Sequence, residues 1–67
     1  MKMKIKTDLI RKKIDSEKMT LLAASEKARI PYGSFLEIMR RGTCNGTTLG
    51  KLARFVGVKA YELVDLT

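Results

Sequence analysis

The chain has 67 residues, which is the length of one small domain. It contains a single cysteine and no histidine, so an internal disulfide and a cysteine-based metal cage are excluded. The same two counts remove most hydrolase, metalloenzyme and redox chemistries, because these use histidine or paired cysteines. We therefore expect no enzyme activity, no catalytic residue, no bound metal and no cofactor.

Charge is the most informative property of the composition. Fourteen Lys and Arg residues against seven Asp and Glu residues give a net charge of +7 and an isoelectric point near 9.9. Residues 1–41 carry 11 of the basic and 5 of the acidic residues, so the excess lies in the first part of the chain. A lopsided positive field on a small domain favours a polyanion partner, with nucleic acid ranked before an anionic membrane.

The hydropathy pattern predicts neither a membrane span nor a secretion signal. No stretch approaches the ~18 consecutive apolar residues of a transmembrane helix. The basic start of the chain has no apolar core region after it, which a signal peptide would need. The expected location is the cytoplasm, with no membrane partner.

The first part of the chain predicts a basic arm followed by two helices. Residues 1–4 have the composition of a flexible arm, and residues 5–17 repeat apolar residues at helical spacing. A second helix is expected over 21–28, with Thr20 as its N-cap because a threonine hydroxyl can accept a free backbone N–H. Three small residues and a leucine share one face of this helix, which predicts close packing against another helix. These residues are Leu21, Ala24, Ser25 and Ala28.

A third helix is expected over 31–40. Pro31 suits the first turn of a helix, because its missing N–H would have been unpaired there. The spacing of the apolar residues turns Phe35, Ile38 and Met39 toward the interior.

The loop after this helix reads RGTCNG. Gly42 and Gly46 are available there for positive φ, and Cys44 is expected to be an exposed bystander thiol. Thr47 or Thr48 is expected to cap a fourth helix.

The fourth helix should end at Gly57, because glycine adopts the left-handed conformation common at helix ends. Residues 59–66 then add one or two helical turns that close the core. No strand is expected. The predicted fold class is therefore all-α, a compact bundle of five short helices in a single domain over residues 5–67.

The order of these features resembles the Cro/C1-type helix-turn-helix domain of phage repressors, which has the lambda-repressor-like fold. Residues 19–42 carry the core of the resemblance, and residues 47–64 are similar to the fourth and fifth helices of the family. The two stretches read MTLLAASEKARIPYGSFLEIMRRG and TTLGKLARFVGVKAYELV. The resemblance implies a DNA-binding transcriptional regulator of a phage or mobile element, acting at the bacterial nucleoid on double-stranded DNA.

In this family the second helix of the motif enters the major groove, which places helix 31–40 on the base pairs. The resemblance assigns base reading to Tyr32, Gly33, Ser34 and Glu37. A serine can donate or accept a hydrogen bond, and a glutamate can accept one from the cytosine amino group.

Phosphate contacts are expected from polar and basic residues around this helix and from the basic arm. They are Thr20, Lys27, Arg40, Arg41, Thr43, Asn45, Lys2, Lys4 and Lys6. The family practice of binding as a homodimer points to residues 58–66 as the dimer surface, with Tyr61, Val64 and Leu66 exposed.

Some residues depart from the family pattern. Arg29 stands where the family usually has glycine, and the early face of helix 31–40 has no Gln, Asn or Arg for bidentate base contacts. Leu22, Tyr32 and Leu36 are either scattered surface residues, with Leu21 in the core, or an apolar patch for a protein partner. The alternative function is therefore a modulator or antirepressor that binds a phage repressor protein and has weak non-specific DNA affinity.

Overall fold

The computed structural model describes residues 2–65 of the chain. Its elements, in chain order, are strand β1 (Met3–Lys4), helices α1 (Thr7–Ser16), α2 (Leu21–Ala28) and α3 (Tyr32–Arg41), strand β2 (Thr43–Cys44), and helices α4 (Gly46–Val56) and α5 (Ala60–Leu63). The five predicted helices are confirmed. None of the helices within residues 2–65 has the length and apolar character that crossing a membrane requires.

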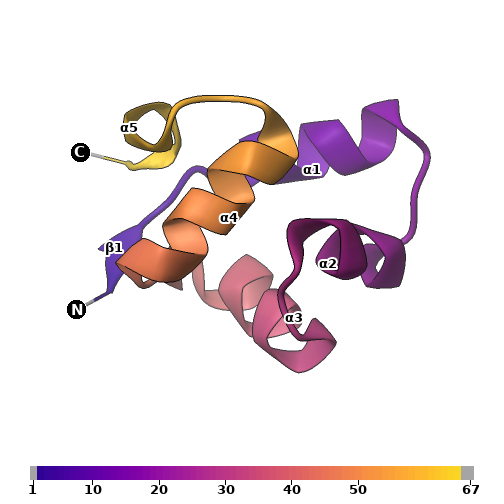
Figure 1. Cartoon of the computed structure of the whole chain (residues 1–67), viewed down its shortest axis with the longest axis horizontal. Helices are drawn as coiled ribbons and strands as arrows, with labels where there is room; N and C mark the ends of the chain where they lie inside the picture. Colours follow the sequence, from indigo (N-terminus) through magenta and orange to yellow (C-terminus); the bar gives the residue numbers. More distant parts are fainter. Residues whose placement is uncertain (1, 66–67) are drawn as a thin grey trace.

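The core is built around α4, which contacts α1, α2 and α5. Figure 1 shows α4 in the middle of the molecule, with α1 and α2 on one side, α5 and β1 on the other and α3 below. The largest fully buried apolar side chains come from four different helices and are Ile10, Phe35, Leu52 and Leu63. Helices that are too short to be stable alone are therefore held by one shared core.

Two strands that the sequence did not predict connect the start of the chain to the α3–α4 connection. Met3 pairs with Cys44 and Lys4 with Thr43 in antiparallel register, and Ile5 forms an isolated bridge with Val64. The predictions of a flexible arm and of a fold without strands are therefore wrong for these residues. The physical reason is alternation: Met3 and Ile5 face the core while Lys4 and Lys6 are exposed, which is the period of a strand.

The same pairing explains why α1 begins at Thr7, two residues later than predicted. The backbone N–H of Ile5 donates to the Gly42 carbonyl at 2.9 Å, and that of Lys6 donates to the Leu63 carbonyl at 2.8 Å. Ile5 and Lys6 thus use their backbone amides in bonds across the fold, so the helix begins only after them.

Helix α2 has the predicted bounds and the predicted cap. The Thr20 hydroxyl accepts the backbone N–H of Ala23 at 3.1 Å. Its face of small residues is buried, as expected, with Ala24 0%, Ser25 1% and Ala28 3% exposed. Leu21, which the spacing placed on the same face, is 40% exposed and lies outside the core.

The turn between α2 and α3 is made by a residue in a left-handed conformation. Arg29 ends α2 with φ 59° and ψ 42°. A side chain raises the energy of this conformation, which is the usual reason for glycine at such a position. The structure therefore shows that this turn keeps its left-handed geometry with arginine in place of glycine.

Arg29→Gly is expected to raise the free energy of unfolding by about 0.5 to 1 kcal/mol. Glycine removes the steric penalty of a side chain in the left-handed conformation, and this gain outweighs the conformational entropy that glycine adds to the unfolded chain. Urea denaturation followed by circular dichroism measures this change. Arg29→Lys is the matched control, since it keeps the charge and the side-chain penalty and should leave stability unchanged. An unchanged or lower stability of the glycine variant would contradict the account.

The connection from α3 to α4 corrects three predictions. The Asn45 side chain, and not Thr47 or Thr48, caps α4, because its Oδ1 accepts the Thr48 N–H at 2.8 Å. Gly42 takes positive φ (72°) as expected, whereas Gly46 is the first residue of the helix and does not. The Cys44 thiol in this connection is also buried and not exposed.

Cys44 is buried, with 3% of its surface exposed, because its strand turns it toward the core. This burial raises the pKa of the Cys44 thiol. A buried thiol of raised pKa is a poor nucleophile at neutral pH.

Candidate nucleic-acid interface

Helix α3 has a buried side and an exposed side. Phe35 and Ile38 are buried, and Pro31 precedes the helix with φ −54°, which is the value that proline prefers. The residues predicted to read bases all lie on the exposed side, and they are Tyr32, Gly33, Ser34 and Glu37. They are therefore accessible to a partner of this helix.

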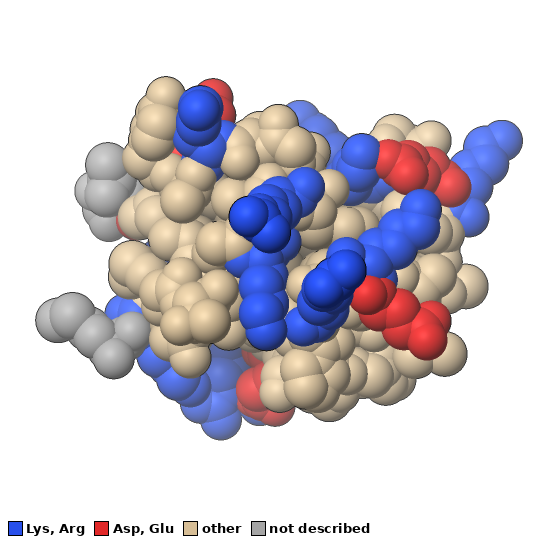
Figure 2. All heavy atoms as spheres, viewed as in Figure 1, with Lys and Arg blue, Asp and Glu red and all other residues tan. Residues whose placement is uncertain are grey.

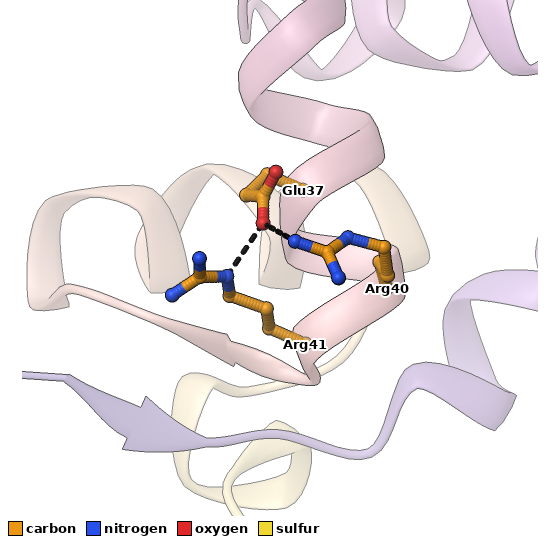
Figure 3. Close-up of polar contacts among 3 residues, drawn as sticks. All are labelled: Glu37, Arg40 and Arg41. Atoms are coloured by element: carbon orange, nitrogen blue, oxygen red, sulfur yellow. Dashed lines mark hydrogen bonds and ion pairs between the residues drawn. The ribbon is translucent and has the colours of Figure 1, made fainter.

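Glu37 is paired with both arginines at the end of the same helix (Figure 3). Its Oε1 accepts a hydrogen bond from Nε of Arg41 at 2.5 Å and another from a terminal guanidinium nitrogen of Arg40. The spacings are four and three residues, so all three side chains rise from one helix face. The hydrogen bonds from Arg41 and Arg40 hold the pKa of the Glu37 carboxyl below its ordinary value.

A partly open hollow of about 210 Å³ lies between α3, the connection to α4 and the start of the chain. We call it the α3–α4 hollow. Its lining residues are Lys2, Ser34, Glu37, Ile38, Arg41, Thr43, Cys44, Asn45 and Thr48. It therefore brings together two of the predicted base-reading residues and four of the predicted phosphate-binding residues from separate parts of the chain.

The N-terminus of α4 opens beside this hollow. The first amides of a helix have no carbonyl partner within it, and the helix dipole makes this end positive. Asn45 engages one of these amides through its Oδ1, which leaves its side-chain NH₂ as a donor. The polar lining of the hollow thus combines cationic side chains, hydrogen-bond donors and one carboxylate.

The other predicted phosphate-binding residues do not line the α3–α4 hollow. Thr20 is exposed and uses its hydroxyl as the α2 cap, and Lys27 Nζ lies 3.9 Å from Oε1 of Glu17. Lys4 and Lys6 are exposed on and just after β1. Arg40, also exposed, reaches this region only through its bond to Glu37.

The three residues of the predicted apolar patch are all exposed, at 51% for Leu22, 44% for Tyr32 and 36% for Leu36. We call them the apolar strip. Leu21, exposed as well, lies in α2 beside Leu22, so the helix begins with two exposed leucines. Exposed apolar side chains mark a binding surface where they form one contiguous patch.

The predicted dimer surface is only partly described by the structure. Tyr61 is 73% exposed, whereas Val64 is partly buried and bridges to Ile5. Leu66 lies outside the described residues. Of the two predicted residues that the structure describes, Tyr61 is therefore the exposed one.

A second group of basic residues was missed by the sequence reasoning. Lys51 and Arg54 are exposed on α4, and Lys51 Nζ donates to the Arg29 carbonyl at 3.3 Å. Figure 2 shows Lys and Arg side chains gathered in the middle of one face, where α4 lies in Figure 1. The spacing of three residues between Lys51 and Arg54 could have indicated that they share one face of α4. The approach of Lys51 to the Arg29 carbonyl depends on the fold.

Within residues 2–65, no three His, Cys, Asp or Glu side chains come together as a metal site requires. No protein-family model, curated protein or solved structure matches this chain significantly. Any inference about function therefore rests on the residues of α3 and of the α3–α4 hollow.

Proposed function

We propose that this protein is a DNA-binding transcriptional regulator of the Cro/C1 type that inserts α3 into the major groove of an operator. The observation that carries the proposal is the α3–α4 hollow, where exposed residues of α3 meet cationic and donor groups from two other segments. Base reading needs an exposed helix side, and positioning needs phosphate ligands beside it. This surface supplies both.

The dimensions and groups are suited to duplex DNA. A major groove about 12 Å wide admits one α-helix, whose early outward residues meet the base edges. In α3, the early outward residues are Tyr32, Gly33 and Ser34. The lining of the hollow includes Ser34 and Glu37. Arg41, Lys2 and the start of α4 would then meet phosphates at the edge of the groove.

One helix of this size contacts only a few base pairs, so a single copy would select its site poorly. We infer binding as a homodimer to two half-sites about 34 to 36 Å apart, one helical turn of DNA. Among the described residues of the segment that would join the two copies, Tyr61 is the large apolar side chain that is exposed. Action on DNA in a bacterial cell places the protein in the cytoplasm, at the nucleoid.

The proposal is tested by selecting bound duplexes from a random DNA pool at low and at near-physiological salt. We expect enrichment of a two-fold related site that survives the higher salt, because base contacts depend less on salt than phosphate contacts do. Ser34→Ala should then lower the preference at one base position by about 0.5 to 1.5 kcal/mol, the value of one hydrogen bond. Ser16→Ala on α1 removes the same hydroxyl away from α3 and is the control.

A second candidate function is supported by the exposure of the apolar strip. A patch of this kind is suited to a protein partner, and the alternative is an antirepressor that binds a phage repressor. A selected pool without sequence enrichment, together with binding that is lost as salt rises, would favour this second function. The apolar strip would then be the surface to test against the repressor protein.

A further inference from the structure

We propose that Glu37 limits the affinity of this protein for non-target DNA by occupying Arg40 and Arg41 when no specific site is bound. The inference deepens the proposed function and rests on it. The observation is the bonding in Figure 3, where one carboxylate oxygen accepts from both guanidinium groups.

A carboxylate and a phosphate compete for the same donors. Both are anions that accept charge-assisted hydrogen bonds from guanidinium groups. Each arginine must therefore leave Glu37 before it can bind a phosphate fully. The three side chains together carry a charge of +1, whereas the two arginines alone would carry +2. Exposed pairs of this kind exchange readily, so the restraint is a competition and not a lock.

The position of Glu37 makes this restraint selective. It is the acidic residue of α3 and the acidic residue that lines the α3–α4 hollow. On most sequences its charge would oppose the approach of phosphates and of acceptor groups in the groove. Where the groove presents a cytosine amino group, the carboxylate gains a donor, and both arginines are released to the phosphates. One residue thereby lowers non-target binding and leaves target binding intact.

No other described glutamate combines these features. Glu17 pairs with Lys13 and Lys27, away from α3, and Glu62 accepts the backbone N–H of Lys59 at the start of α5. Glu26 is exposed on α2 and has no ion pair within 4.0 Å among residues 2–65. Glu26 therefore offers a matched control, because its neutralisation changes the net charge equally.

The test compares Glu37→Gln with Glu26→Gln for binding to a duplex of random sequence, measured by fluorescence anisotropy over a range of salt. We expect Glu37→Gln to bind about tenfold more tightly than Glu26→Gln at low salt. Its salt dependence should be steeper by about 0.9 for each arginine that gains a phosphate. Adding Arg40→Ala and Arg41→Ala to Glu37→Gln should remove this gain. Circular dichroism checks that each variant is folded.

Equal affinities of the two glutamine variants would overturn the inference, because Glu37 would then act only through net charge. The wild-type pool selection tests the proposed function separately. If the pool shows no sequence enrichment but Glu37→Gln binds random DNA more tightly than Glu26→Gln, operator binding is rejected and the competition by Glu37 is retained. If the pool is enriched in one site but the two glutamine variants bind random DNA equally, operator binding is retained and the competition by Glu37 is rejected. Absence of all DNA binding would reject both.

Discussion

Replacement of Phe35 with alanine is expected to lower the free energy of unfolding by about 3 to 5 kcal/mol, the range for a fully buried aromatic side chain. Phe35 is 0% exposed and is among the largest side chains of the core. A domain of 67 residues is expected to have a total stability of about 3 to 10 kcal/mol. The variant should therefore be partly or largely unfolded at room temperature, as circular dichroism and urea denaturation would show.

The control for this substitution is Tyr61→Ala, which removes a ring of similar size from a position that is 73% exposed. It should change the free energy of unfolding by less than about 0.5 kcal/mol, as surface substitutions usually do. If the two variants lost similar stability, the core assignment of α3 would be wrong. The exposed side of α3 would then also need to be reassigned.

Arg41→Ala is the functional substitution with the largest expected effect. Arg41 lines the α3–α4 hollow and is exposed, so it can reach a phosphate once it leaves Glu37. Its loss should weaken binding to the selected site by about tenfold, which corresponds to about 1.4 kcal/mol for one charge-assisted contact. The loss on a random duplex should be smaller, because Glu37 occupies Arg41 there. On the selected site, the slope of log affinity against log salt should fall in magnitude by about 0.9, the value for one phosphate contact.

Arg11→Ala is the matched control, because Arg11 is an exposed arginine on α1 that does not line the α3–α4 hollow. The same anisotropy titrations measure both variants on the selected site and on a random duplex. Equal losses in the two variants would show that only total charge matters. Equal losses on the selected site and on the random duplex for Arg41→Ala would show that Glu37 does not restrain Arg41.

Local patterns predicted the helices well, because the signals that start and end a helix lie within a few residues. The Thr20 hydroxyl caps a helix that begins at the next residue, and Gly57 ends α4 with φ 89°. The pairing of Glu37 with Arg40 and Arg41 was also readable in principle, since spacings of three and four residues place side chains on one helix face. The exposure of the predicted base-reading residues follows from the same periodicity.

The choice of the α4 cap shows where local reasoning becomes ambiguous. Asn45, Thr47 and Thr48 are all good N-cap residues, and propensity alone does not separate them. The pairing of β2 accounts for the outcome, because Cys44 is held in a strand, Asn45 follows it as the cap and the helix begins at Gly46. A long-range contact thus selects among local alternatives of similar energy.

The chain's own sequence determined the sign of its surface charge, the number and approximate limits of its helices, and the division of α3 into a buried and an exposed side. Tertiary structure alone decided that Met3 pairs with Cys44, that the Cys44 thiol is buried and that Leu21 is exposed. It also brought Lys2, Ser34 and Asn45 to one hollow. The physical reason is range: helix periodicity and capping act over about four residues, whereas strand pairing and hollows depend on segments that meet only after the core has formed.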